Sequence, residues 1–301
     1  MFDRPAHSPI IVDGGLSTYL ESEGYDVSTA LWSASLLAQA PSAIEQAHRD
    51  FFSAGAEVAV TASYQASFAG FAAAGMTRPF AEEMMRRSVR VADHARAAFR
   101  SEHQDDDRPL WIAASIGPYG ARLTGGAEYA GRYGLSVERL RARHRAEFEV
   151  LASADPDVLA CETIPDIDEA EALIGLIEES DKPAWLSYTI RDGRTAAGQP
   201  LEDAFAAARD VDGVVAVGVN CCDPVGLTDV IALAGECSGK PVIVYPNSGE
   251  SWDATARRWT GRPRYDPRFA PAWRDAGARL IGGCCRVHPP QITAVAAALT
   301  A

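Results

Sequence analysis

Short apolar runs recur along the chain, and most of them end at Gly, Pro, Asn or Cys. The runs at 10–12, 214–217 and 242–244 are continuously apolar instead of alternating, which is typical of strands buried on both faces of a parallel sheet. Because short apolar runs bounded by turn residues indicate strands, the pattern predicts eight of them, at 9–15, 56–64, 110–117, 158–162, 184–190, 214–221, 242–246 and 279–283.

Segments with the apolar spacing of a helix lie between these runs. The first two open at or beside a proline, a residue that is favoured in the first helical turn. The predicted helices cover 41–54, 79–100, 136–152, 167–179, 201–209, 224–234, 268–276 and 290–299. Eight strand–helix units close a barrel of about 250 residues. The sequence therefore predicts an α/β fold, a single-domain (β/α)8 TIM barrel over residues 1–301.

Two connections are longer than is usual between such units. Residues 119–134 are rich in Gly and Tyr, and residues 247–267 contain Trp252 and Trp259. Long loops in compact domains are commonly functional. The polar segment 101–108 is interpreted as a solvated turn before the third strand.

Composition narrows the range of partners. The 301 residues include 28 Lys and Arg against 41 Asp and Glu, a formal net charge of −13, which argues against binding a nucleic-acid backbone. The first residues lack the apolar core of a secretion signal, and no apolar stretch is long enough to span a bilayer. We therefore expect a cytoplasmic protein that acts on small molecules and binds neither nucleic acid nor membrane. Its oligomeric state is not predicted.

Polar residues gather where the predicted strands end, at the rim that carries the active site in such barrels. Carboxylates, thiols and a Gly-Gly pair all occur there, which a random scatter of turn residues would not produce. The strand-end segments are Asp13-Gly14-Gly15, Thr61-Ala62-Ser63-Tyr64-Gln65, Ser115-Ile116-Gly117-Pro118, Cys161-Glu162-Thr163, Asn220-Cys221-Cys222, Tyr245-Pro246-Asn247-Ser248-Gly249 and Gly282-Gly283-Cys284-Cys285.

Three of the six cysteines are suited to a metal site. Cys221 on the sixth strand and Cys284 with Cys285 on the eighth would meet across the barrel mouth, and three thiolates with one open position make a catalytic zinc site. Gly282-Gly283 would let both adjacent sulfurs turn toward one ion. The spacing leaves Cys222 as an alternative to Cys221. For Cys161 and Cys237 we expect ordinary burial.

A zinc ion with three thiolate ligands carries a formal charge near −1, so it is a poor activator of water. A thiol that enters the fourth position would instead be deprotonated and remain electron-rich. This matters because a free thiol, with a pKa of about 8.5, is mostly protonated at pH 7. The implied reaction is attack of a thiolate on an electrophilic carbon.

Taken together, the motifs resemble those of the homocysteine S-methyltransferases over essentially the whole chain, most closely the bacterial and plant branch that uses S-methylmethionine. The residues that carry the resemblance are Asp13-Gly14-Gly15, Leu31-Trp32-Ser33, Thr61-Ala62-Ser63-Tyr64-Gln65, Ser115-Ile116-Gly117-Pro118-Tyr119-Gly120, Cys161-Glu162-Thr163, Gly218-Val219-Asn220-Cys221, Tyr245-Pro246-Asn247-Ser248-Gly249-Glu250 and Gly282-Gly283-Cys284-Cys285-Arg286.

The resemblance implies a zinc-dependent barrel that transfers a methyl group from S-methylmethionine or S-adenosylmethionine to L-homocysteine, forming methionine. It implies no catalytic residue beyond the zinc-bound thiolate of the substrate. By its motifs, the zinc ligands are Cys221, Cys284 and Cys285, and the contacts to homocysteine are Asp13, Glu162 and Thr61.

The donor site is less defined by sequence. A sulfonium is a cation, so an acidic, aromatic mouth would receive it best. Two other functions stay open, a thiol methyltransferase that uses betaine or another donor and a non-enzymatic thiol redox or zinc-buffering protein. His288 is not expected to be a ligand or a base. The candidates for the donor site are Trp32, Tyr64, Tyr119, Tyr245, Glu250 and Trp252.

Overall fold

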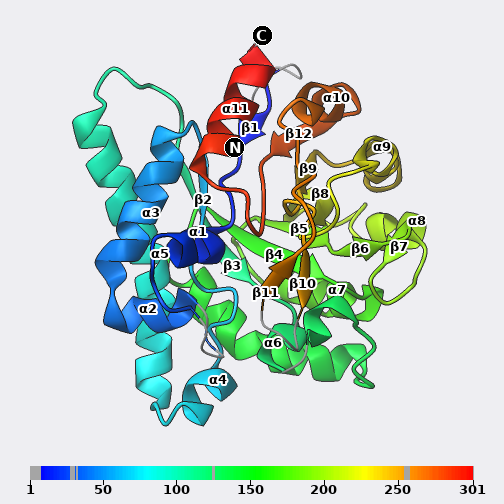
Figure 1. Cartoon of the computed structure of the whole chain (residues 1–301). Helices are drawn as coiled ribbons and strands as arrows, with labels where there is room; N and C mark the ends of the chain where they lie inside the picture. Colours follow the sequence, from blue (N-terminus) through cyan, green and yellow to red (C-terminus); the bar gives the residue numbers. More distant parts are fainter. Residues whose placement is uncertain (1–7, 28–30, 32, 124–125, 254–257, 301) are drawn as a thin grey trace.

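The computed structural model describes residues 8–27, 31, 33–123, 126–253 and 258–300. Its centre is an eight-stranded parallel sheet in the order β1-β12-β9-β8-β5-β4-β3-β2 (Figure 1). A parallel bridge between Val12 and Val58 joins the two edges, so the strands form a nearly closed barrel. The strands are β1 (Ile10–Ile11), β2 (Val58–Val60), β3 (Trp111–Ile116), β4 (Val158–Ile164), β5 (Ala184–Tyr188), β8 (Val214–Asn220), β9 (Val242–Tyr245) and β12 (Ala278–Ile281).

Side chains from the strands alternate between two apolar clusters, as the period of two requires. One cluster fills the barrel and includes Val158, Trp185 and Ile243. The neighbouring positions, such as Leu159 and Leu186, belong to the larger cluster between the strands and the helices. Burial on both faces is the physical reason for the continuously apolar runs in the sequence.

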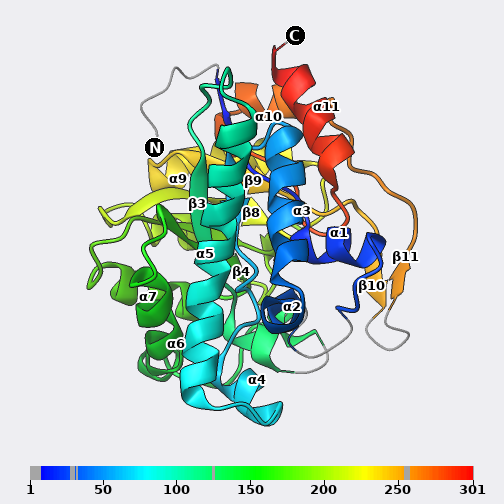
Figure 2. The same cartoon turned by 90° about the vertical axis from the view of Figure 1, so that its left-hand side faces the viewer.

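The helices cover the outside of the barrel (Figures 1 and 2). All eight predicted helices are present, and side-chain caps fix some of their starts: the Thr77 hydroxyl accepts from Phe80 N, and the Ser136 hydroxyl accepts from Arg139 N. These helices are α3 (Pro41–Ser53), α5 (Arg78–Glu102), α6 (Val137–Ala152), α7 (Ile167–Ile177), α8 (Leu201–Ala206), α9 (Leu227–Ser238), α10 (Phe269–Asp275) and α11 (Pro289–Thr300). The predicted barrel is confirmed.

The differences from the prediction are short elements and one turn. A helix of one or two turns is too short to show a period in the sequence. Segment 101–108 is more than a solvated turn, because α5 continues to Glu102 and the Arg108 guanidinium donates to the carbonyls of Phe52 (3.1 Å) and Ala56 (3.3 Å). The elements that the pattern missed are α1 (Leu16–Ser22), α2 (Ser33–Gln39), α4 (Phe68–Ala73), the 3-10 helices η1 (Tyr119–Arg122) and η2 (Ala127–Tyr129), and the hairpins β6 (Ile190–Arg191) with β7 (Arg194–Thr195) and β10 (Ser251–Asp253) with β11 (Arg258–Thr260).

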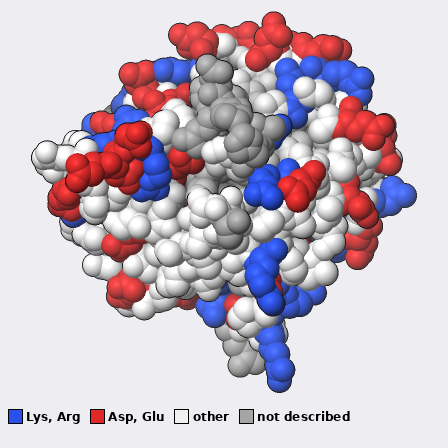
Figure 3. Space-filling view, turned by 90° about the horizontal axis from the view of Figure 1, so that it is seen from above, with Lys and Arg blue, Asp and Glu red and all other residues white. Residues whose placement is uncertain are grey.

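The surface is charged in both signs. Figure 3 shows one face of the molecule, on which acidic and basic side chains are interspersed. Within the described ranges, no helix combines the length and the apolar character needed to cross a bilayer.

Two glycine substitutions test the packing of the barrel. A Cβ atom on Gly218 would lie 1.8 Å from the Ile243 carbonyl oxygen, so we expect Gly218→Ala to destabilise the fold by about 3 kcal/mol. On Gly235 in α9 it would lie 3.5 Å from a Val242 methyl, an ordinary contact. Gly235→Ala should therefore stabilise the helix by about 0.5–1 kcal/mol. Urea unfolding of both variants measures the difference, and equal midpoints would contradict this account of the packing.

Candidate active site

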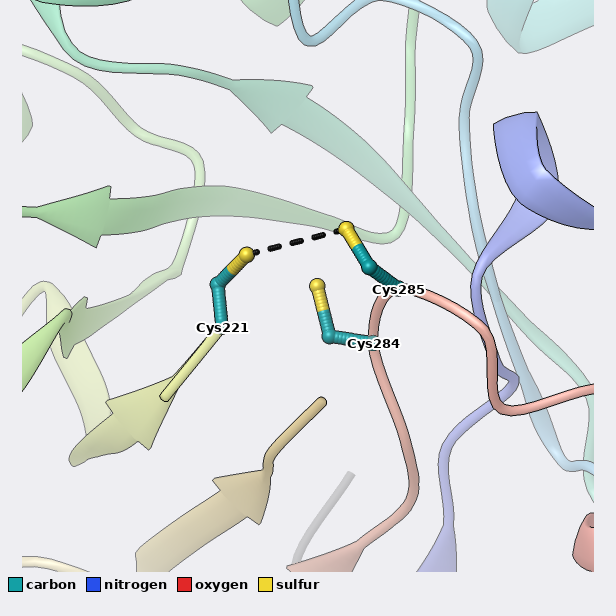
Figure 4. Close-up of side chains that lie close together, drawn as sticks. All are labelled: Cys221, Cys284 and Cys285. Atoms are coloured by element: carbon teal, nitrogen blue, oxygen red, sulfur yellow. Dashed lines mark hydrogen bonds between the residues drawn. The ribbon is translucent and has the colours of Figure 1, made fainter. Parts of the chain in front are cut away.

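Three thiols meet at the mouth of the barrel, from two separate strand ends. Cys221 follows β8, and Cys284 and Cys285 follow β12 (Figure 4). The Sγ atoms of Cys221 and Cys285 are 3.8 Å apart, and all three Sγ atoms lie within 4.8 Å of one another. All six cysteines are free thiols. The structure thus brings together the three cysteines that the sequence singled out.

The end of β8 explains why Cys221 and not Cys222 joins this cluster. Cys221 has a φ of 50°, an uncommon backbone conformation for a residue other than glycine. After this turn, Cys222 is buried in the apolar cluster between the strands and the helices. Asn220 ties the strand end to Thr163, whose φ is 59°, since the Asn220 Oδ1 accepts from Thr163 N (2.7 Å) and its Nδ2 donates to Thr163 Oγ1 (2.8 Å).

The segment after β12 is fixed mainly by its backbone. Cys284 N donates to the Pro246 carbonyl (2.8 Å), and Cys285 N donates to the Asn247 side chain (3.1 Å). Gly283 matters here because of close packing: a Cβ atom on it would lie 2.2 Å from a Val287 methyl. The sequence suggested that Gly282-Gly283 would adopt a backbone conformation that other residues avoid. The structure differs, because neither residue has a positive φ.

The donor set fits a zinc ion. At a Zn–S distance of about 2.3 Å, the edge of a tetrahedron of sulfurs is about 3.8 Å, which matches the separation of Cys221 and Cys285. Hydrogen bonds from Cys284 and from Cys285 lower the pKa of the Cys221 thiol well below its ordinary value. The contact with Cys221 raises the pKa of each partner. The cluster therefore favours a thiolate at Cys221, and its three sulfur donors could hold a soft metal.

Two carboxylates lie buried beside the thiols. Asp13 is 1% exposed and accepts a hydrogen bond from Val60 N (2.8 Å). Glu162 is 6% exposed and accepts from the Ser115 hydroxyl and from the Tyr245 hydroxyl (3.0 Å). Burial raises the pKa of Asp13 and raises that of Glu162 to about 7, in spite of these hydrogen bonds. A bound cation would favour the charged form of both groups.

Thr61 lies in the same cavity, with its hydroxyl in the wall. Its Oγ1 accepts from Ser115 N (3.1 Å) and is 2.8 Å from the Ser63 hydroxyl, which itself donates to the Ser115 carbonyl (2.7 Å). These bonds tie the end of β2 to β3. Thr61 therefore mainly stabilises the cavity wall against which a ligand would lie.

All six predicted site residues line one cavity of about 120 Å³. Among the described residues that line it, none is Lys, Arg or His. A second cavity of about 750 Å³ shares Tyr129 and Cys221 with the first. The thiol cluster therefore lies at the junction of two spaces, and the smaller one is anionic.

Three of the donor-site candidates named from the sequence line one of these two cavities. Tyr64 and Tyr245 line the small cavity, and the Tyr245 hydroxyl also accepts from Trp185 Nε1 (3.0 Å). Glu250 lines the large cavity and forms an ion pair with Arg286.

Of the described candidates, Tyr119 lines neither cavity. Tyr119 packs on Tyr133, at 5.3 Å between ring centroids. Trp32 and the side chain of Trp252 lie outside the described residues. His288 lies outside the thiol cluster and packs against Tyr19.

Among the cavity residues that sequence reasoning missed, Glu128 and Tyr129 lie on the same loop. The Tyr129 hydroxyl is 3.1 Å from the Cys221 Sγ. The available signal was the unusual length of the connection 119–134, which singled out the loop but not its residues.

Fold and site together define a (β/α)8 barrel protein with a three-thiol metal-binding cluster at its mouth. Comparison with known proteins identifies the family, because the family model for homocysteine S-methyltransferase matches residues 10–299. The chain belongs to the homocysteine S-methyltransferase family.

Individual relatives cover almost the full chain. Homocysteine S-methyltransferase 4 from Zea mays is 44% identical, over 99% of this chain and 91% of its own. Homocysteine S-methyltransferase from Escherichia coli is 41% identical, over 96% and 94%. The crystal structure of the homocysteine methyltransferase MmuM from Escherichia coli, in its metallated form, has a TM-score of 0.87 at 39% identity and covers 96% of both chains.

Proposed function

We propose that this protein transfers a methyl group from S-methylmethionine, or from S-adenosylmethionine, to L-homocysteine and so forms methionine. The observation that carries the proposal is one cavity that combines three thiols with two buried carboxylates and has no cation in its described lining. Family membership supports homocysteine as the acceptor. The proposed unit is the whole barrel, residues 1–301.

Cys221, Cys284 and Cys285 are proposed to hold Zn²⁺, because their sulfur geometry suits that ion. When bound, zinc would lower the pKa of a thiol that enters its open position and so supply a thiolate near neutral pH. The free thiols also favour a reducing compartment, so we propose that the protein works in the cytoplasm.

The remaining wall of the cavity is proposed to bind the amino acid part of homocysteine. Asp13 and Glu162 are carboxylates held by strand ends, and an ammonium group pairs well with carboxylates within hydrogen-bond reach. Their mutual repulsion contributes to the raised pKa of Asp13, and a shared ammonium would relieve it. Thr61 is proposed to shape this end of the cavity through its bonds to Ser63 and Ser115.

The transfer itself is a substitution at carbon. The homocysteine sulfur forms the new bond to the methyl carbon, while the bond from that carbon to the donor sulfur breaks. The electron pair of the broken bond stays on the donor sulfur, which changes from a sulfonium to a neutral thioether. The step needs no oxidant or reductant, and the chain's contribution is to position the two sulfurs and exclude water.

A donor panel tests the function directly. With L-homocysteine as acceptor, we expect methionine formation from S-methylmethionine and a lower or comparable rate from S-adenosylmethionine. The rate with betaine should be lower by at least about tenfold, because a tertiary amine is a poorer leaving group than a thioether. Methionine is measured by chromatography. Reversible thiol oxidation without turnover of any donor would instead indicate a redox or zinc-buffering protein.

The metal site is tested by single thiol deletions. Zinc determination on purified protein is expected to give close to one ion per chain. Cys284→Ala should lose both the zinc and the activity, because one of three thiolate ligands is removed. Cys222→Ala is the matched control and should keep both, since its side chain is packed in the core. Retention of zinc and activity by Cys284→Ala would refute the proposed site.

The Glu162 carboxylate gives a pH signature. Its pKa of about 7 means that it is ionised at pH 8 and mostly protonated at pH 6, so its attraction for an ammonium is lost as the pH falls. We expect Glu162→Gln to raise the KM for homocysteine about tenfold at pH 8 but less than about threefold at pH 6. The ratio of variant to wild-type KM cancels the titration of the substrate thiol. A ratio that does not change with pH would contradict this role.

A further inference from the structure

The small cavity contains a third carboxylate, Glu128, which neither the motifs nor the proposed acceptor site uses. It is half-buried on η2 and lines the cavity together with the three thiols. Among the residues that the structure describes, no Lys, Arg or His forms an ion pair with it. Burial raises the pKa of Glu128, and so does the proximity of Cys221. The group therefore lacks a cation that would stabilise its charge.

The segment that carries Glu128 is fixed in place. Gly126 begins it with a φ of 77°, and Tyr129 N donates to the Gly126 carbonyl (3.0 Å). On the far side, Arg132 N donates to the Asp166 carboxylate (2.7 Å). Because the next residue, Tyr129, places its hydroxyl 3.1 Å from the Cys221 sulfur, Glu128 is held on the wall beside the thiol cluster.

Two neighbours make this wall suitable for a cation. The side-chain oxygen of Gln65, Oε1, is buried and has no hydrogen-bond partner in the structure as described, and Gln65 lines the same cavity. The ring of Tyr64 also lines it, and Glu128 contributes to the raised pKa of the Tyr64 hydroxyl. An acid, an amide oxygen and an aromatic ring form an environment that attracts a positive charge.

We propose that Glu128 is the group that recognises the sulfonium charge of the methyl donor. This inference rests on the proposed function and deepens it, because it assigns a place to the donor. Asp13 and Glu162 are held by hydrogen bonds from the strand ends, where they suit the acceptor. Among the acids that line the larger cavity, Glu250 pairs with Arg286 and Asp223 pairs with Arg264, and the three thiols do not all line that cavity. Glu128 is the acid that has the thiol cluster beside it and no cation of its own.

The reaction predicts how Glu128 contributes to the kinetics. The sulfonium charge diminishes as the methyl group moves to the thiolate and is gone in the product. A carboxylate beside the donor therefore stabilises the bound donor more than the transition state, so its loss weakens binding without slowing the chemical step.

Kinetics of Glu128→Gln test the assignment. The KM for S-methylmethionine is expected to rise at least about tenfold, the equivalent of one lost ionic contact of about 1.4 kcal/mol. The expected kcat is within about threefold of wild type, and the homocysteine KM and zinc content are expected to be unchanged. Glu128→Asp, which keeps the charge, should restore most of the donor affinity. Glu236→Gln removes one exposed carboxylate on α9 and is the control for net charge.

A second donor separates the sulfonium from the amino group. 3-(Dimethylsulfonio)propanoate carries the sulfonium but no ammonium, and it can be assayed as a donor or as an inhibitor competitive with S-methylmethionine. Recognition of the sulfonium predicts that Glu128→Gln weakens both compounds by a similar factor. Weakening of S-methylmethionine alone would assign Glu128 to the ammonium and overturn the proposal.

The two proposals fail in different ways. If the wild-type protein uses no sulfonium donor with homocysteine, the proposed function is wrong. If the wild type is active but Glu128→Gln keeps its donor KM within about twofold, only the role of Glu128 is wrong. Calorimetric titration of S-methylmethionine into the zinc-loaded protein, without homocysteine, gives the same comparison independently of turnover.

Discussion

The site depends on the burial of negative groups that no described Lys, Arg or His of the cavity lining neutralises. Removing a carboxylate from water costs several kcal/mol unless hydrogen bonds or a counter-charge replace the lost hydration. The barrel provides the hydrogen bonds: Val60 N for Asp13, and the hydroxyls of Ser115 and Tyr245 for Glu162. These only partly offset the burial, because the pKa of both carboxyl groups remains raised. The cavity thus favours ligands that bring positive charge.

The sequence predicted the barrel well because each of its strands is buried on both faces. That burial makes runs such as 242–244 continuously apolar, so they stand out between helix-period segments. It could not predict α1, α2 or α4, whose six or seven residues pack against the larger core but complete too few turns to show a period. The role of Arg108 was equally hidden, since its acceptors are backbone carbonyls near the end of α3.

The site residues likewise fall into those that the sequence could predict and those that it could not. Asp13, Thr61, Glu162 and the thiols could be predicted because parallel strands deliver their carboxyl ends to one rim, and the structure brings them into one cavity. Glu128 and Tyr129 could not, because a tertiary contact from Arg132 N to Asp166 fixes their loop. The preference for Cys221 over Cys222 came from a family motif. Its physical basis, a left-handed backbone conformation after Asn220, has no signature in the sequence.

Under the proposed reaction, the negative charge of the cavity favours binding of the donor over binding of the products. A thiolate and a sulfonium are consumed together, and both products are uncharged at sulfur. The fixed anions that attract the donor therefore bind the products less strongly. This asymmetry requires an acid that keeps its place as the sulfonium charge disappears, and the backbone turn at Gly126, closed by the bond from Tyr129 N to the Gly126 carbonyl, holds Glu128 in that way. The buried acids thus favour binding of the cationic donor, and the loss of its charge in the reaction weakens their attraction for the products.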